Sequence, residues 1–361
     1  MSDLFSSFQL GDLTLNNRIF MAPLTRCRAE GEHVPTPLMA EYYGQRASAG
    51  LIIAEATMIH PGNSAFWHEP GIYSEAQIAA WKQVTDTVHH EGGKIALQIW
   101  HGGRACHPDL NNGTVPVAPS AIPISGEEVH TPKGKQSYTT PRALDDAEIP
   151  GIVKGFAQAA RNAIAAGFDL VEVHGANGYL LDEFLRDGSN QRTGPYGGTR
   201  ENRARILFET LSAVGAAIGS HRVGLRLSPL NSFNDMRDSD PVGLITWLSE
   251  GLNAFDLAYL HVMRSDFYGR QTGDVLTPAR TNFRGPLISN MGYSIKEAQE
   301  AVTSGQVDAI AFGTAFLANP DLPARIRLNT ALNTPDQSTF YTSGAEGYTD
   351  YPVLGSGSRQ T

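Results

Sequence analysis

The sequence predicts an α/β protein built as a single (β/α)8 barrel, the TIM-barrel fold, with one excursion after the third strand. Short apolar runs alternate with longer amphipathic segments, eight such runs can be counted, and polar residues stand at the ends of most of them. Alternating strand and helix patterns indicate a parallel sheet. An open sheet gathers its ligand residues at one crevice, whereas a barrel draws them from nearly every strand end. The spread of polar residues therefore favours the closed barrel.

The expected strands are short runs rich in β-branched and apolar residues. They cover Arg18–Leu24, Gly50–Ala56, Lys94–Trp100, Asp169–His174, Arg222–Ser228, Asp256–Val262, Pro286–Asn290 and Asp308–Gly313. Apolar residues at three- and four-residue spacing predict helices between and after these strands. The helices cover Ser74–Glu91, Ile149–Ala166, Thr199–Gly219, Pro241–Leu252, Ser294–Ser304 and Asp321–Leu332.

One long segment, Gly102–Ala147, does not fit the alternation of strand and helix. It is rich in Gly, Pro, Ser and Asn, and it has no periodic run long enough for a barrel helix. An insertion of this kind either caps the mouth of a barrel or is a plain surface loop. We expect residues 1–354 to form one domain and the GSGSRQT tail, residues 355–361, to be disordered.

Composition excludes several classes of protein. The 361 residues include 28 Lys+Arg against 37 Asp+Glu, a net charge of −9, and 41% of them are hydrophobic. This acidic balance, without a basic stripe, argues against a nucleic-acid binder. No apolar run approaches the roughly 20 residues that a membrane helix needs. We therefore expect a globular protein with a large core and neither nucleic acid nor membrane as a partner.

The amino terminus and the cysteines bear on the cellular compartment. The first residues lack the charged start and the apolar run of a secretory signal, which predicts a cytoplasmic protein. Cys27 and Cys106 are the only cysteines, and they are expected to be reduced thiols in that compartment. No C-x-x-C or similar spacing is present, so no metal site is expected.

The strongest candidate for chemistry is the loop that follows the fourth predicted strand. That strand ends at His174, so His174, Asn177 and Tyr179 emerge together at the barrel mouth. A neutral histidine and an asparagine can each donate a hydrogen bond to one oxygen on which negative charge develops, and a tyrosine can supply a proton. A histidine at a strand end can also be a packing residue, and this segment alone leaves both interpretations open.

Earlier strands carry residues suited to a flat heterocyclic ligand. Thr25 and Gln98 can hydrogen-bond the edge of a ring, Ala56 is small enough to let a ring approach the backbone, and Trp100 offers a rigid wall. Each has a structural alternative, since Thr25 could cap the next segment and Trp100 could belong to the core.

The later strands carry features suited to an anion. Arg226 lies in an apolar strand, where burial is costly unless an anion, a hydrogen-bonding ligand or a structural salt bridge meets it. Gly292 and Gly313 follow the last two strands and lead into helices, where exposed backbone N–H groups suit a phosphate. They could equally be turn glycines.

Taken along the chain, these segments resemble the Old Yellow Enzyme family, the FMN-dependent ene-reductases. The motifs that carry the resemblance are MAPLTR from Met21, QIWHGGR from Gln98, VEVHGANGYLLDEFL from Val171, NQRTGPYGGTRENRAR from Asn190, RLSP from Arg226, AFG from Ala311 and EGYTDYP from Glu346. They occur in the same order over essentially the whole chain, which makes the resemblance far more specific than any single motif.

The resemblance implies a role for each candidate residue. The flavin ring would be held by Pro23, Thr25, Ala56, Gln98 and Arg226. The FMN phosphate would lie on the backbone around Met291, Gly292, Gly313 and Thr314. His174 and Asn177 would bind the carbonyl oxygen of an activated alkene, and Tyr179 would protonate its α-carbon. The pocket walls would be Phe66, Trp100 and Tyr341.

Four positions distinguish this chain within the resemblance. Thr314 stands where family members often carry an arginine that contacts phosphate, so either phosphate affinity is lower or another cation compensates. Met291 stands where many relatives have glycine. Thr25 and Asn177 stand where a thermophilic-like subclass carries cysteine and histidine, so the chain resembles the classical subclass.

The implied activity is the reduction of α,β-unsaturated carbonyl or nitro compounds, with NADPH, or secondarily NADH, reducing the FMN. Two other functions stay open at this stage. One is a flavin-free barrel enzyme acting on a phosphorylated metabolite, although no lysine stands at the end of a predicted strand to serve an aldolase. The other is a non-catalytic flavin-binding protein. The sequence is compatible with a monomer or a homodimer.

Overall fold

In the computed structural model, which describes residues 3–355, eight parallel strands close into a barrel. They are β3 (Ile19–Met21), β4 (Ile52–Met58), β5 (Ile95–Trp100), β10 (Leu170–Gly175), β11 (Val223–Leu227), β12 (Tyr259–Met263), β13 (Leu287–Asn290) and β14 (Ala309–Phe312). Each pairs with the next strand of this series, and β14 pairs with β3. All eight predicted strands and the closed barrel are confirmed. The predicted tail lies, after its first residue, outside the described residues.

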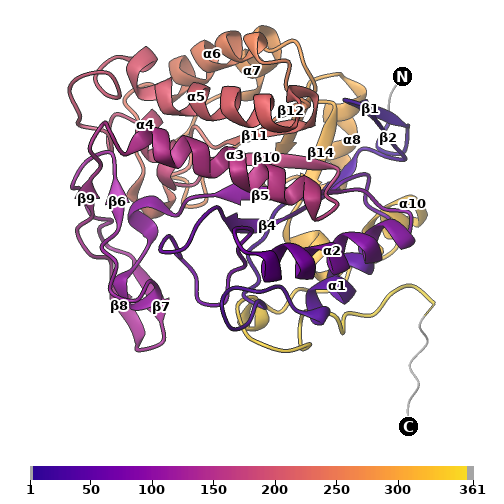
Figure 1. Ribbon diagram of the computed structural model, residues 1–361. Coiled ribbons are helices and arrows are strands. Elements are labelled where there is room, and N and C mark those ends of the chain that lie inside the picture. Colours follow the sequence, from indigo (N-terminus) through magenta and orange to yellow (C-terminus); the bar gives the residue numbers. More distant parts are fainter. Residues whose placement is uncertain (1–2, 356–361) are drawn as a thin grey trace.

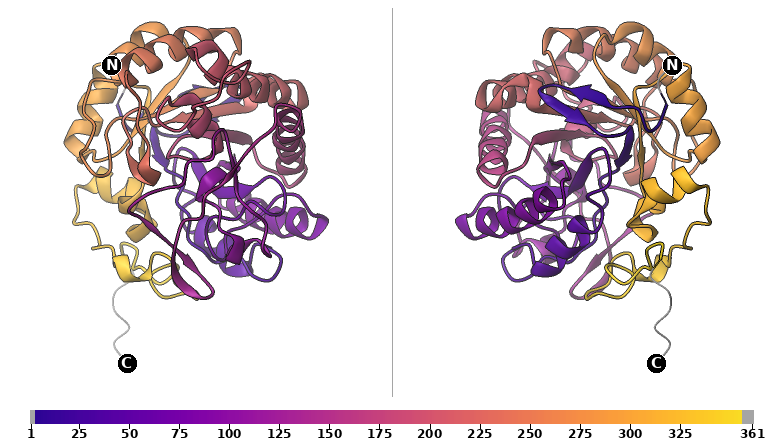
Figure 2. Two further views of the ribbon diagram at one scale, coloured as in Figure 1. Left: turned by 90° about the vertical axis from the view of Figure 1, so that its left-hand side faces the viewer. Right: turned by 90° about the vertical axis from the view of Figure 1, so that its right-hand side faces the viewer.

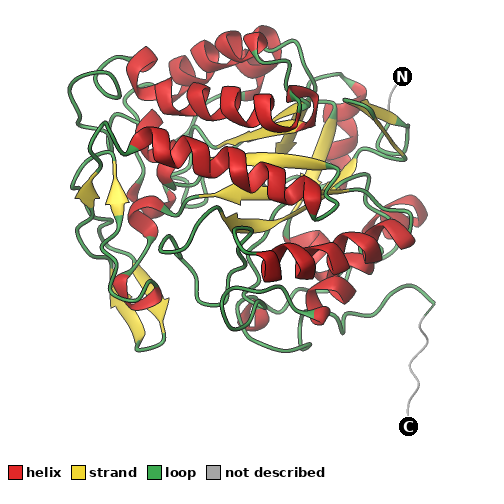
Figure 3. Ribbon diagram, in the orientation of Figure 1, coloured by secondary structure: helices red, strands yellow, loops and turns green. Residues whose placement is uncertain are grey.

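A helix follows each barrel strand and covers its outer side (Figures 1 and 3). These helices are α1 (Pro37–Gly44), α2 (Glu75–His90), α3 (Ile149–Ala165), α5 (Arg200–Ile218), α6 (Pro241–Gly251), α7 (Leu276–Asn282), α8 (Ile295–Thr303) and α10 (Leu322–Leu328). Two short helices, α4 (Leu180–Leu185) and α9 (Thr314–Ala318), directly follow β10 and β14. The six predicted helices are confirmed, whereas α1, α4, α7 and α9 are too short to show a clear apolar period.

Helix α10 is shorter than predicted. The periodic pattern continues to Leu332, but the helix ends at Leu328. Asn329 adopts the left-handed conformation, with φ 51°, and its backbone N–H closes the last turn on Arg325 and Ile326. Asparagine tolerates this conformation, which stops helix propagation.

The alternation of side chains along each strand separates two cores. On β10, Val171 and Val173 pack in the large cluster between the strands and the helices. Leu170 points the other way, into an interior cluster that includes Phe20 and Ile288. Because side chains alternate along a strand, Glu172 and His174 also face the interior. The interior of the barrel therefore changes from apolar to polar toward the carboxyl ends of its strands.

An antiparallel hairpin closes the amino end of the barrel (Figure 2, right). It consists of β1 (Phe8–Leu10) and β2 (Leu13–Leu15), and its apolar side chains join the interior cluster. Its turn needs glycine, because Gly11 has φ 55° and a Cβ there would lie 2.4 Å from the carbonyl oxygen of His221.

The excursion after β5 lies at the opposite end of the barrel from this hairpin (Figure 1; Figure 2, left). It contains β6 (Val117–Ala118) paired with β9 (Arg142–Ala143), and a hairpin of β7 (Glu128–Thr131) and β8 (Gly134–Ser137). Ala105 and Ile124 of this segment pack in one cluster with Trp100 and Tyr179. The segment therefore covers the barrel mouth.

The structure also bears on the two cysteines and on membrane-spanning helices. Cys27 and Cys106 are both buried and free. Within residues 3–355, no helix is long and apolar enough to cross a bilayer.

Candidate active site

A cavity of about 320 Å³ opens at the carboxyl ends of the strands. The predicted site residues that line it are Pro23, Asn177, Arg226, Met291, Gly292, Gly313 and Thr314. They come from β11, from the segments that follow β3, β10, β13 and β14, and from the start of α9, so the closed barrel brings together residues that are almost 300 positions apart. Carboxyl strand ends are where barrel enzymes build their sites.

Below the cavity, a buried polar layer crosses the barrel. The Gln98 Nε2 donates to Glu172 Oε1 at 2.7 Å, and His261 Nδ1 lies 2.9 Å from Glu172 Oε2. Burial opposes the charge on Glu172, but His261, Arg226 and Gln98 outweigh it and lower the pKa of the carboxyl. Because Gln98 uses its amide hydrogen on Glu172, its carbonyl oxygen is left to accept a bond from a ligand.

Arg226 sits beside this layer without a bonded partner of its own. It is 6% exposed, and its Nε has no hydrogen-bond partner in the described part of the chain. The Glu172 carboxylate is instead bonded to Gln98 and His261. A buried guanidinium without a bonded partner is costly, so the geometry favours a ligand over a structural salt bridge.

His174, Trp100 and Tyr179 form an aromatic corner next to the cavity. The Tyr179 ring lies edge-on to Trp100, with centroids 4.3 Å apart, and 5.1 Å from the His174 ring. Burial, with Arg226 and His261 nearby, lowers the pKa of His174 well below its usual value, so the imidazole is neutral and carries one N–H donor. Burial raises the pKa of Tyr179 well above its usual value, so the phenol keeps its proton.

Asn177 is held from three sides. It adopts the left-handed conformation, with φ 57°, and its backbone N–H donates to Ser228 Oγ at 2.8 Å. Its side-chain Oδ1 accepts a bond from Asn231 Nδ2 at 2.9 Å, and its backbone carbonyl accepts one from Asn234 Nδ2 at 2.9 Å. The remaining side-chain donor, Nδ2, bonds no other described residue.

The three residues predicted as pocket walls stack into one aromatic wall, and none of them is among the residues that line the 320 Å³ cavity. Phe66 stacks on Trp100 with centroids 6.1 Å apart and on Tyr341 with centroids 6.0 Å apart. Tyr341 is 62% exposed, so this wall reaches from the buried interior to the surface. Ala56 packs in the same apolar cluster as Trp100.

Thr25 is the predicted residue with the least structural support. It follows the cavity-lining Pro23, but it does not line the cavity, and it bonds no other described side chain. The neighbouring Glu55 accepts bonds from the Tyr43 hydroxyl at 3.1 Å and the Arg26 N–H at 3.2 Å. Glu55 is therefore a hydrogen-bonded structural residue rather than a free base.

The loop after β13 has a backbone conformation that favours glycine at position 291. Met291 has φ 88° and Gly292 has φ 67°, so two consecutive residues adopt left-handed conformations. Such a conformation strains a residue with a side chain. Arg264 spans this pair, since its Nε donates to the Met291 carbonyl and its Nη2 to the Gly292 carbonyl, both at 2.8 Å.

Sequence reasoning missed Glu172, Asn231, Asn234 and Arg264 as site residues. Two of them left a visible signal: Glu172 is a charged residue inside an apolar strand, and Arg264 follows the end of β12. The two asparagines lie four and seven residues beyond Leu227, where β11 ends, in a polar run that has no periodicity to mark it. Their roles depend on contacts with distant residues.

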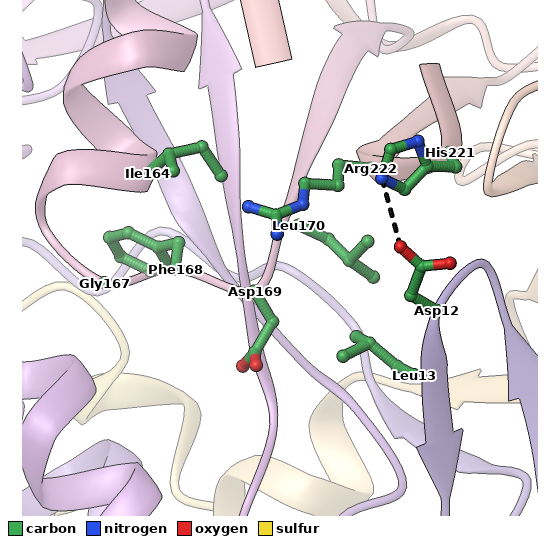
Figure 4. A pocket seen from close by; sticks show the side chains of 9 residues that line it. All are labelled: Asp12, Leu13, Ile164, Gly167, Phe168, Asp169, Leu170, His221 and Arg222. Carbon is green, nitrogen blue, oxygen red and sulfur yellow. Dashed lines mark ion pairs between the residues drawn. The ribbon is translucent and has the colours of Figure 1, made fainter. Parts of the chain in front are cut away.

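A second cavity, of about 270 Å³, lies at the amino end of the barrel (Figure 4). It is bounded by Asp12, Asp169, His221 and Arg222, with His221 and Asp12 forming an ion pair at 3.3 Å. None of the predicted site residues reaches it. The chemistry is therefore expected only at the carboxyl end.

A buried carboxyl next to the aromatic wall makes stability depend on pH. Glu69 is fully buried, its Oε1 accepts the Ala65 N–H at 2.9 Å, and its Oε2 has no partner in the described part of the chain. Burial raises the pKa of Glu69 to about 8. From about pH 4.5 to about pH 8, the folded protein keeps a proton that the unfolded chain has lost, so stability falls as pH rises.

We expect Glu69→Gln to remove the loss of stability at high pH, because glutamine keeps the hydrogen bond to the Ala65 N–H and carries no charge. At pH 5 the melting temperature of the variant should be nearly that of the parent, and at pH 9 it should be several degrees higher. The corresponding gain in the free energy of unfolding is at most roughly 5 kcal/mol. Thermal unfolding at pH 5, 7 and 9 measures this. Glu128→Gln, at an exposed position of β7, is the control. An equal shift at all three pH values would contradict the prediction.

The fold and this site define a class of protein, the (β/α)8-barrel enzymes that build their sites at the carboxyl ends of the strands. The model of the NADH:flavin oxidoreductase / NADH oxidase family matches residues 3–333. The chain belongs to this family and, within it, to the Old Yellow Enzymes that its motifs predicted.

Three relatives illustrate the similarity. A Leishmania infantum protein named probable flavin mononucleotide-dependent alkene reductase is 52% identical over 350 residues, covering 96% of each chain. The old yellow enzyme from Trypanosoma cruzi is 44% identical with a TM-score of 0.95, covering 98% of this chain and 99% of the other. Morphinone reductase in complex with tetrahydroNAD is 46% identical with a TM-score of 0.94, covering 100% of both.

The protein is thus an FMN-dependent oxidoreductase that uses NADPH or NADH to reduce the C=C bond of activated alkenes. The two alternatives drawn from the sequence, a flavin-free barrel enzyme and a non-catalytic flavin-binding protein, are wrong.

Proposed function

We propose that His174 and Asn177 bind the oxygen of an α,β-unsaturated carbonyl or nitro compound and that Tyr179 supplies the proton to its α-carbon. The observation that carries this proposal is the pair of uncommitted donors, the neutral His174 imidazole and the free Asn177 Nδ2, next to a protonated phenol. Two donors on one oxygen stabilise the negative charge that develops there during reduction. An alkene without such an oxygen offers the donors nothing to stabilise.

The cavity fits FMN. Arg226 has an unpartnered guanidinium, Gln98 has a free carbonyl oxygen, and Met291, Gly292, Gly313 and Thr314 line the far side. We propose that Pro23, Thr25, Ala56, Gln98 and Arg226 hold the flavin ring and that the backbone of the four lining residues holds the phosphate. Bound FMN supplies two-electron transfer between nicotinamide and alkene.

Arg264 is our candidate for the cation that Thr314 does not provide. It holds the carbonyls of Met291 and Gly292, lies 3.6 Å over the Tyr293 ring and faces Glu297 at 3.4 Å. By binding these carbonyls it keeps the strained loop in place, and it brings a positive charge to the phosphate end.

Arg264→Gln is therefore expected to weaken FMN binding about tenfold and to leave riboflavin binding unchanged, since riboflavin lacks the phosphate. Quenching of flavin fluorescence on titration of the apoprotein measures both dissociation constants. Arg280→Gln is a matched control, because Arg280 also binds two loop carbonyls and a carboxylate, Asp308, away from the cavity. Equal weakening of both ligands would assign Arg264 a purely structural role.

Other features of the protein stay proposals. We propose Phe66, Trp100 and Tyr341 as walls that orient the substrate, supported by their stacking. Residues 1–354 are proposed as one domain, because Arg26 and Arg46 bind carbonyls of Gly347 and Tyr348 near the other end of the chain. A cytoplasmic location, and assembly as a monomer or a homodimer, remain predictions.

An anaerobic titration of the purified protein tests the proposed reaction. Visible absorption is followed while NADPH, and then 2-cyclohexenone, is added. We expect a flavin band that bleaches with NADPH and returns with the enone. A band that bleaches and never returns would reopen the substrate class, and a protein without flavin even after FMN is supplied would overturn the assignment.

A further inference from the structure

We propose that Asn231 is a positioning residue that fixes which way the Asn177 side-chain amide points. The inference rests on the proposed function, in which Asn177 donates to the substrate oxygen. Asn231 is fully buried, and its Nδ2 lies 2.9 Å from Asn177 Oδ1.

The contacts of the Asn231 side-chain oxygen determine which of the two asparagines donates in this hydrogen bond. The Asn231 Oδ1 accepts the backbone N–H of Phe267 at 3.2 Å and of Phe233 at 3.5 Å. A backbone N–H can only donate, so the oxygen of Asn231 must face it. Asn231 then presents its NH2 group to Asn177, whose own oxygen must accept.

The side-chain amide of Asn177 is the part of this residue that could still rotate. Its backbone is bonded to Ser228 Oγ through the N–H and to Asn234 Nδ2 through the carbonyl, so the residue itself cannot turn away. Rotation of the side-chain amide by half a turn would exchange oxygen for nitrogen at the cavity. With the oxygen held by Asn231, the cavity receives Nδ2, a donor. With the amide reversed, an oxygen would face the substrate oxygen and repel it.

The anchor of this relay is rigid. The segment after β12 that contains Phe267 is organised by Asp266, which accepts the Ser232 N–H at 2.7 Å and the Arg270 N–H at 2.7 Å. Asp266 thereby ties this segment to the one that carries Asn231. The loops after β11 and β12 thus together orient Asn177, in the loop after β10, so that its Nδ2 faces the cavity as a donor.

The test compares Asn231→Asp with Asn231→Leu. A carboxylate only accepts, so in N231D the Asn177 NH2 group would turn toward it and leave the cavity with an oxygen. We measure the single-turnover reoxidation of dithionite-reduced holoenzyme by 2-cyclohexenone, which avoids nicotinamide binding. We expect N231D to be slower than the parent by about 10- to 100-fold at pH 8.

The pH dependence separates positioning from general damage. Burial, and the nearby Asp266 carboxylate, should raise the pKa of the new carboxyl. Once protonated, it donates to Asn177 Oδ1 again, so the N231D deficit should shrink toward pH 5.5. N231L has no such group, and its deficit should not change with pH. A structural defect alone would not recover in this way.

Two controls complete the design. Asn253→Asp alters a similar relay elsewhere, in which Oδ1 accepts the Arg284 N–H at 2.9 Å and Nδ2 donates to the Asn282 carbonyl at 2.7 Å, and it should react at the parent rate. Asn177→Ala reports on the proposed function. If N177A is slow while N231D keeps the parent rate and pH profile, the inference about Asn231 is overturned alone. If N177A also reacts at the parent rate, the proposed role of Asn177 fails and the inference fails with it.

Discussion

Replacing His174 and Asn177 together by alanine is expected to lower the rate of alkene reduction by about 10³-fold or more. Removing one donor from a developing oxyanion costs about 10²- to 10³-fold, and losses at two donors to the same oxygen do not simply multiply. Both residues are buried, with 3% and 8% of their surface exposed, so water replaces them poorly. Stopped-flow reoxidation of the reduced protein by 2-cyclohexenone measures the effect.

Two single substitutions of His174 provide the comparison for the double variant. His174→Asn keeps a hydrogen-bond donor of similar reach, so it should lose less than His174→Ala. The flavin absorbance of each variant shows whether the cofactor site is intact. Turnover of cyclohexenone at the parent rate by the double variant would remove both residues from the mechanism.

Replacing Tyr179 by phenylalanine is expected to slow alkene reduction by about 10²- to 10⁴-fold while reduction of the flavin by NADPH stays near the parent rate. The substitution keeps the ring that packs edge-on against Trp100 and removes only the proton source. The nicotinamide step delivers no proton to carbon and should not need the hydroxyl. The two half-reactions are measured separately under anaerobic conditions.

The comparison of the two half-reactions makes this prediction specific. Equal losses in both would indicate a damaged site rather than a missing proton donor. Tyr351→Phe is the control, because the Tyr351 hydroxyl accepts the Asp336 N–H in the carboxyl-terminal segment, away from the cavity. It should leave both half-reactions at the parent rate.

Most of the barrel could be predicted from the chain because strands and long helices are local patterns. The eight strands follow from runs of β-branched residues, and helices such as α3 and α5 are long enough to show their period. Short elements were not predictable in this way: α4 has only six residues, all buried, so it shows no contrast between two faces. Its place is decided by packing against its neighbours.

In the candidate site too, features that depend on neighbouring residues could be predicted and features that depend on distant residues could not. His174, Asn177 and Tyr179 lie within six positions of one another, after one strand, so their convergence could be predicted from the sequence. Periodicity also predicted that Arg226 lies inside a strand. Its lack of a bonded partner could not be predicted, because that depends on Glu172 being bonded to Gln98 and His261 from two other strands.

Local chemistry in the chain was thus sufficient for the fold class, the strand ends and the chemical character of the catalytic loop, because these depend on residues a few positions apart. Tertiary structure alone decided the direction of the Asn177 amide, the support of Met291 and Gly292 by Arg264, and the neutrality of His174. Asn177 and Asn231 are 54 positions apart, and the pKa of His174 depends on burial by the closed barrel. Burial and hydrogen-bond direction are properties of the folded surroundings, which no local pattern contains.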